Sequence, residues 1–196
     1  MSDLVKVGIV IFNEVEVLDF AGPYEVFSLA SKRNEKIFEV KTISETSEVI
    51  SARNGLKILP DLSFDDEPTF SILIVPGGYG AEEIEIKNPT MIKWLKSQQN
   101  KVEILASVCT GALLLAEAGM LDNKKVTTHW MDCDRLEKEY PKVEVVRGVK
   151  FVDEGNILTS GGISAGINMS FHLIKSLFGA EVVKNLAKRM EYDIEI

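Results

Sequence analysis

The stretch Ile104–Leu121, "ILASVCTGALLLAEAGML", decides the fold, because an apolar run typical of a buried strand passes directly into a helical pattern. Cys109 stands at the junction, within Ser107-Val108-Cys109-Thr110-Gly111. The small residues around it match in outline the G-x-S-x-G nucleophile elbow, a tight turn that projects its middle side chain. Ligands of parallel α/β sheets bind beyond the carboxyl ends of the strands. The junction therefore predicts a functional cysteine at the rim of such a sheet.

Short apolar runs rich in β-formers alternate with helical patterns on both sides of this junction, which is typical of a parallel sheet covered by helices on both faces. We expect one domain over residues 1–196, a flavodoxin-like three-layer α/β sandwich with a mostly parallel central sheet. The expected central strands are Lys6–Phe12, Phe38–Ile43, Ile72–Val75, Val102–Ala106, Val126–Thr128 and Ile157–Thr159. The expected helices are Gly22–Ser31, Pro89–Gln98, Thr110–Ala118, Met131–Glu139, Ala165–Phe178 and Ala180–Met190.

Two turn signals predict β-hairpins outside this alternation. Asn54-Gly55 lies within "EVISARNGLKILPDLSF", where alternating residues flank the strongest short hairpin signal. Gly155-Asn156 divides "VKFVDEGNILTS" in the same way.

Composition excludes several classes of function. The net charge of −8 argues against a nucleic-acid partner, because nucleic-acid binders gather Lys and Arg into a basic patch. No apolar run has a membrane helix's length of about 18 residues, and no secretory signal is present. Two cysteines make no disulfide framework, so we expect a cytoplasmic protein. We find no metal-ligand spacing, P-loop or dinucleotide fingerprint, and we expect no metal and no cofactor.

The thiol of Cys109 is the candidate nucleophile. At a helix N-terminus its pKa is expected to fall from about 8.5 to roughly 3.5–7.5, which makes a thiolate available. The alternative is a buried structural cysteine, since Cys packs like a small hydrophobe. Cys133, within the charged segment "WMDCDRLEKEY", is expected to be a surface thiol without a role.

Four further segments carry candidate site residues. After the strand ending at Val75, the amides of Gly77, Gly78 and Tyr79, with the amide that follows Cys109, are expected to form an oxyanion hole, unless the glycines serve only the turn.

Asp19, between Leu18 and Phe20, is either a helix N-cap or a desolvated carboxyl that exchanges a proton with substrate. Glu25 is a less favoured candidate for this proton-exchanging role. His129 ends another strand and is either structural or at the rim. Residues Gly161, Gly162 and Ser164 open the last long helix and either bind a ligand or pack.

These segments together resemble the ThiJ/PfpI superfamily over nearly the whole chain, and within it they are most similar to the isonitrile (isocyanide) hydratases. The resemblance rests on "LDFAGPYEVF", "PGGYG", "SVCTGALLLAEAGMLDNKKVTTHW" and "TSGGISAGIN". It implies a class I glutamine amidotransferase-like fold, a homodimer, Cys109 as nucleophile and Asp19 as acid/base. Thr110 stands where PfpI-like proteases have histidine. Asn168 departs from the aspartate expected there.

The resemblance implies hydration of a small electrophile, with isocyanide converted to N-substituted formamide through a covalent thioimidate. Two alternatives stay open. One is a glyoxalase III-like enzyme, in which the thiolate attacks an aldehyde. The other is a redox or ligand sensor similar to the N-terminal domain of AraC-type regulators. Those regulators append a helix-turn-helix domain, and the sequence ends at Ile196, so we favour the enzyme.

Overall fold

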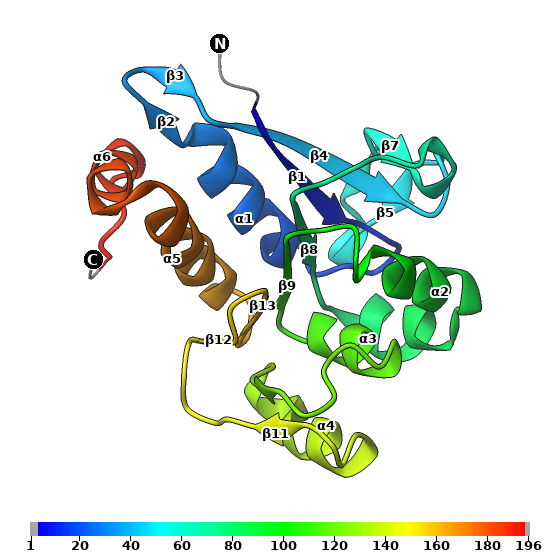
Figure 1. The fold of residues 1–196 in the computed structure, drawn as a ribbon. Helices are drawn as coiled ribbons and strands as arrows, with labels where there is room; N and C mark the ends of the chain where they lie inside the picture. The colour runs from blue at the N-terminus through cyan, green and yellow to red at the C-terminus, as the bar shows by residue number, and fades with distance from the viewer. Residues whose placement is uncertain (1–3, 195–196) are drawn as a thin grey trace.

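A seven-stranded sheet forms the centre of the computed structural model, which describes residues 4–194 (Figure 1). Its strand order is β12-β13-β9-β8-β1-β4-β7, and every neighbouring pair is parallel except the antiparallel β12–β13. The strands are β1 Val5–Val10, β4 Phe38–Ser44, β7 Leu62–Ser63, β8 Ile72–Val75, β9 Ile104–Val108, β12 Phe151–Asp153 and β13 Ile157–Ser160. Because β8 and β9 are neighbours, the turns that follow them meet at one edge of the sheet.

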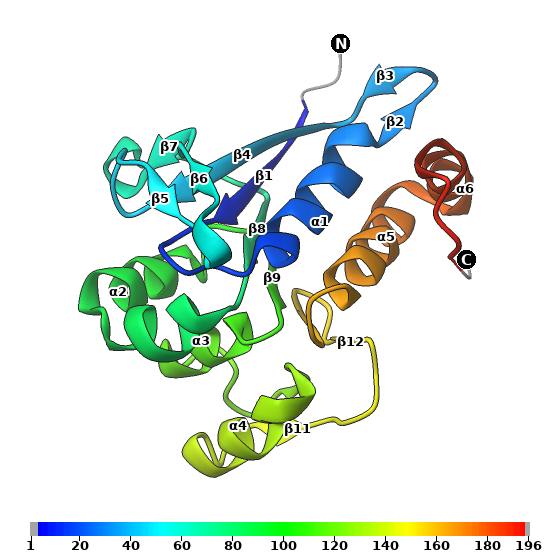
Figure 2. The same ribbon diagram turned by 180° about the vertical axis from the view of Figure 1, so that it is seen from behind.

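Helices cover both faces of this sheet, which gives three layers. The helices α1 Val17–Leu29, α5 Ala165–Phe178 and α6 Ala180–Met190 pack against one another on one side (Figure 2). On the other side lie α2 Pro89–Gln98 and α3 Gly111–Glu117. The core between the layers is apolar and includes fully buried Ile9, Phe27, Leu73 and Leu114. The predicted α/β sandwich is confirmed.

Several predicted elements have the bounds expected from the sequence. The strand β8 and the helices α2, α5 and α6 match residue for residue. Both hairpins also form: β5 Ile50–Ser51 pairs antiparallel with β6 Lys57–Ile58, and β12 pairs antiparallel with β13.

Helix α1 begins five residues earlier than predicted. Asp19 consequently lies inside the first turn, and the N-cap is Glu16, so the N-cap interpretation of Asp19 is wrong. Pro23, expected in the first turn, lies further along the helix, where its missing N–H removes the donor that would pair with the carbonyl of residue 19. Burial of Phe20, Val26 and Phe27 against the core stabilises the helix despite this loss.

The predicted central strand at Val126–Thr128 is also wrong. Strand β10 Lys125–Val126 pairs with β11 Glu144–Val145 in a separate two-stranded unit beside α4 Cys133–Glu139. Thr127 and Thr128 are buried but lie outside any strand, and the backbone N–H of Thr127 donates to the hydroxyl of Thr159 at 2.8 Å. A side chain thus supplies the partner that a sheet neighbour would have supplied.

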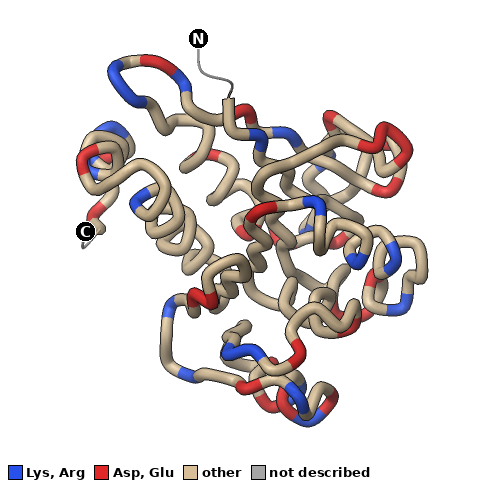
Figure 3. The backbone as a smooth tube through the Cα atoms, viewed as in Figure 1, with Lys and Arg blue, Asp and Glu red and all other residues tan. Residues whose placement is uncertain are grey.

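The remaining elements were not predicted because they are one turn or two residues long. They are the hairpin β2 Ser31–Lys32 with β3 Glu35–Lys36, the 3₁₀ turns η1 Arg53–Gly55, η2 Phe64–Asp66, η4 Glu85–Lys87 and η5 Trp130–Asp132, and the π-helix η3 Gly80–Ile84. No helix within residues 4–194 has the length and apolarity needed to cross a membrane. Lys and Arg are interspersed with Asp and Glu over the outer helices and loops (Figure 3).

Candidate active site

Cys109 occupies a strained turn between β9 and α3. Its φ is 55°, in the left-handed region that non-glycine residues rarely adopt. Three hydrogen bonds hold it there: its N–H donates to the carbonyls of Ser160 and Gly161, each at 3.1 Å, and its carbonyl accepts from the Thr128 hydroxyl at 2.8 Å. The surrounding elements therefore enforce the conformation expected of a nucleophile elbow.

A second strained residue faces the same sulfur. Ile163, in the loop between β13 and α5, has a φ of 45°, an outlier for a β-branched side chain. The backbone N–H groups of Ile163 and Thr110 both point at the Cys109 thiol. Two amides from different loops thus converge where negative charge would develop on the sulfur.

The carboxyl of Asp19 lies against this thiol and is completely buried. Its Oδ2 accepts a hydrogen bond from the Gly77 N–H at 3.0 Å, while Oδ1 has no hydrogen-bond partner among residues 4–194. Burial raises the pKa of Asp19 from its ordinary 3.8 to about 7; the Gly77 and Cys109 contacts oppose this shift, and the charges of Glu16 and Glu82 add to it. Asp19 is therefore poised to take up and release a proton near neutral pH.

The thiol itself differs from the sequence-based expectation. Burial first, and then the negative charge of Asp19, raise the pKa of Cys109, and the amides of Ile163 and Thr110 offset only part of the rise. Only 5% of the residue is exposed, and the helix that follows it has seven residues. The effect of desolvation on the pKa of Cys109 therefore outweighs the opposite effect of the helix N-terminus. Because one group's charge changes the other's affinity for protons, Cys109 and Asp19 titrate as a pair.

Thr110 joins the elbow to the glycine-rich turn after β8. Its hydroxyl donates to Oε1 of Glu82 at 3.0 Å and accepts from the Gly78 N–H at 2.9 Å. A Cβ at Gly77 would lie 2.5 Å from the Thr110 nitrogen, so only glycine permits this approach. Glu82 lies in the π-helix η3, and such turns often occur at functional sites. The sequence offered no signal for Glu82, since no period or motif marks a π-helix.

The glycine-rich turn has partners other than those expected for an oxyanion hole. The amide of Gly77 is bonded to Asp19 and that of Gly78 to Thr110. Tyr79 directly precedes the π-helix, and 48% of the residue is exposed. The amide of Thr110, which follows Cys109 and was part of the predicted hole, does face the sulfur, and the amide of Ile163 joins it.

Three of the other predicted site residues, Gly161, Gly162 and Ser164, line a cavity of about 490 Å³ next to the elbow, whereas His129 is not among its lining residues. The His129 ring packs where a Cβ at Gly162 would be, and its Nδ1 accepts from the Met131 N–H at 3.4 Å and lies 3.7 Å from Asp132. His129 thus caps the turn η5 and makes no hydrogen bond to the thiol.

Cys133 also lines this cavity and is buried, so the expected surface thiol is wrong. Its sulfur lies 3.6 Å from the carbonyl of His129, because η5 turns the start of α4 toward the core. Burial raises its pKa.

The described residues thus bring together a thiol, a carboxyl with a near-neutral pKa and two converging amides. They include no group of three or more His, Cys, Asp or Glu side chains able to hold a metal ion. This arrangement can carry out nucleophilic addition with proton transfer.

Comparisons with known proteins identify relatives of this chain. A profile of the DJ-1/PfpI family matches residues 5–176. Isonitrile hydratase of Pseudomonas putida is 31% identical over 95% of this chain and 78% of the hydratase. The transcriptional regulator GbdR of Pseudomonas aeruginosa is 26% identical over 96% of this chain, which spans 51% of the regulator. The crystal structure of Drosophila melanogaster DJ-1beta superposes with a TM-score of 0.84 at 20% identity, covering 98% of this chain and 100% of that one.

The raised pKa of Asp19 predicts a specific pH dependence of stability. The folded state binds a proton more tightly than the unfolded state, so the free energy of unfolding falls as pH rises from about 4 to about 7. Relative to Asp19→Asn, wild type should lose up to about 4 kcal/mol across this window, at about 1.4 kcal/mol per pH unit. Urea denaturation at several pH values measures this, and Cys109→Ala, which keeps the buried carboxyl, should also lose stability as pH rises. A pH-independent difference would contradict the assignment.

Glu82 predicts a second effect, because its charge helps to raise the pKa of Asp19. Glu82→Gln keeps an acceptor for the Thr110 hydroxyl but removes the charge, so the pKa of Asp19 should fall below about 7. Carbon-detected NMR titration of the aspartate carboxyls measures it, with Glu117→Gln as a matched control. An unchanged Asp19 midpoint in Glu82→Gln would exclude this electrostatic role.

Proposed function

We propose that the chain, which belongs to the DJ-1/PfpI family, is a cysteine-dependent enzyme that adds water to a small electrophile, with isocyanide as the leading substrate class. One observation carries the proposal: the buried carboxyl of Asp19, with a pKa of about 7, lies against the Cys109 thiol. The similarity to isonitrile hydratase supports the choice of substrate.

The first half of the reaction forms a covalent bond. Asp19 accepts the thiol proton, and the Cys109 sulfur attacks the terminal carbon of the isocyanide. The protonated carboxyl then delivers that proton to the same carbon, which gives a thioimidate and returns Asp19 to its ionised form. Proton exchange within the pair removes the need for a low thiol pKa, which burial does not permit here.

The second half hydrolyses the thioimidate. Ionised Asp19 takes a proton from water as the oxygen adds to the carbon, and it passes this proton to the nitrogen. Collapse of the tetrahedral species expels the Cys109 sulfur, which regains a proton from the new hydroxyl through Asp19. The products are an N-substituted formamide and the starting enzyme, so one carboxyl serves as base and acid in turn.

Neither histidine supports a cysteine–histidine mechanism. His129 is engaged by the turn η5, and Nε2 of His172 is bonded to Asp153 at 2.7 Å on another part of the surface. Asp19 is the titratable group that contacts the thiol among the described residues, and this favours a carboxyl-based reaction.

A ligand or redox sensor is the second candidate. The match to GbdR favours it, and the same buried thiol would then report on a bound molecule or on oxidation. Turnover separates the two functions, since a sensor requires none.

Turnover of an aromatic isocyanide tests the proposal. Wild type should form the formamide, Cys109→Ala should form none, and Asp19→Asn should be slower by at least about 10²-fold, the usual contribution of a positioned proton carrier. Formamide is measured by liquid chromatography, with circular dichroism to confirm folding. Cys133→Ala serves as the matched thiol control and should keep the wild-type rate. No formamide from wild type, or a near-normal rate in Asp19→Asn, would refute the mechanism.

We also propose, from the family alone, that two copies of the chain form a homodimer. Light scattering at micromolar concentration should give twice the chain mass of 21.8 kDa. A mass near 21.8 kDa would contradict it.

A further inference from the structure

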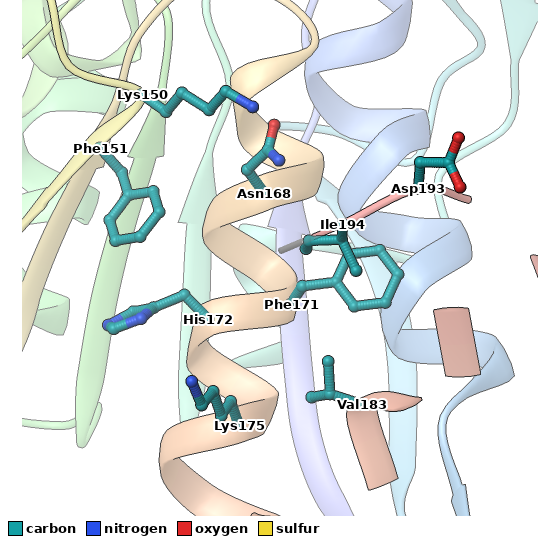
Figure 4. Close-up of a pocket in the computed structure, with 9 residues that line it drawn as sticks. All are labelled: Lys150, Phe151, Asn168, Phe171, His172, Lys175, Val183, Asp193 and Ile194. Atoms are coloured by element: carbon teal, nitrogen blue, oxygen red, sulfur yellow. The ribbon is translucent and has the colours of Figure 1, made fainter. Parts of the chain in front are cut away.

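A second cavity, of about 630 Å³, lies between β12, α5, α6 and the segment at Asp193–Ile194 (Figure 4). This volume lies within the range of sites for small organic molecules. The cavity is separate from the thiol, and neither Cys109 nor Asp19 lines it.

Two lysines without a partner among residues 4–194 line this cavity, one toward each end of it (Figure 4). Lys150 precedes β12 and Lys175 belongs to α5, and among residues 4–194 neither ammonium has a hydrogen-bond or ion-pair partner. The neighbouring His172 differs, because its Nε2 is bonded to Asp153 at 2.7 Å. In a chain with a net charge of −8, two free ammonium groups at one cavity favour an anionic ligand.

The cavity has a polar end at Lys150 and Asn168 and an apolar wall next to it. Figure 4 shows the Lys150 ammonium and the Asn168 amide reaching the same end from different elements. The rings and branched side chains of Phe171, Val183 and Ile194 form the apolar wall, and Phe171 is buried and stacked on Tyr192 with centroids 5.6 Å apart.

The only carboxyl among the lining residues is that of Asp193. It lies on the opposite side of the cavity from Lys150, which orients an anion toward the Lys150 end (Figure 4).

Hydrogen bonds connect this end of the cavity to the elbow. The carbonyl of Lys150 accepts from the Gly161 N–H at 2.8 Å, and the carbonyl of Gly161 accepts from the Cys109 N–H at 3.1 Å. Lys150 and Asn168 also line the smaller cavity beside the elbow. A molecule bound at Lys150 would therefore touch the segment that holds the strained cysteine.

We propose that the larger cavity binds a small monocarboxylate with an apolar body, its carboxylate held by Lys150 and Asn168 and its body by Phe171, Val183 and Ile194. A carboxylate pairs with an ammonium and a neutral amide donor in charge-assisted hydrogen bonds, whereas an uncharged analogue gains only the apolar contact. This site goes beyond the proposed hydration reaction and does not depend on it.

Calorimetric binding of 4-phenylbutyrate and its uncharged amide, 4-phenylbutanamide, tests the site at low ionic strength. Wild type should bind the acid at least about tenfold more tightly than the amide, as expected for a charge-assisted contact. Lys150→Gln and Asn168→Asp should each remove this preference, the second because its carboxylate repels the ligand. Lys96→Gln makes the same charge change on α2, outside this cavity, and should behave as wild type.

Methyl NMR distinguishes the two cavities. Val183 lines only the larger cavity and Val149 only the smaller, so 4-phenylbutyrate should shift the Val183 methyl signals. Equal binding of acid and amide, no binding at millimolar concentrations, wild-type affinity in both variants, or shifts confined to Val149 would each overturn the proposal.

Discussion

Burial of the Asp19 carboxyl against the Cys109 thiol is the constraint on which the rest of the site depends. Two acidic groups in a desolvated space cannot both be ionised without a large electrostatic cost, so the site favours states in which they share a proton. The Gly77 amide offsets only part of this cost for the carboxylate. The site thus stores a proton next to the Cys109 thiol, and burial keeps bulk water away from both groups.

The fold holds this pair through contacts between loops. Turns after β8, β9 and β13 meet at one edge of the sheet. Thr110 links the first two, and Gly161 of the third accepts a hydrogen bond from the Cys109 N–H. The left-handed conformations of Cys109 and Ile163 cost about 1–3 kcal/mol each and persist only when neighbouring structure enforces them. Strained residues of this kind cluster at functional sites, and here two of them lie at the same sulfur.

The sequence predicted what depends on pattern and on position along the chain. The alternation of strands and helices gave the α/β sandwich, and the strand-to-helix junction located Cys109. The sequence could not predict features that depend on contacts between distant segments. The raised pKa of Cys109 arises from burial and from Asp19, 90 positions away, and the role of Glu82 arises from a π-helix that no period marks. Helix-terminus electrostatics alone gave the wrong direction for the thiol.

The order in which the pair loses its protons tests this account most directly. Infrared spectra recorded between pH 5 and 10 can follow the carboxyl C=O band of Asp19 and the S–H band of Cys109, each assigned by its loss in Asp19→Asn or Cys109→Ala. We expect the carboxyl band to disappear with a midpoint near pH 7 while the S–H band of Cys109 persists. Loss of that S–H band at a lower pH than the Asp19 carboxyl band would contradict the account, because Cys109 would then be an independent low-pKa thiolate.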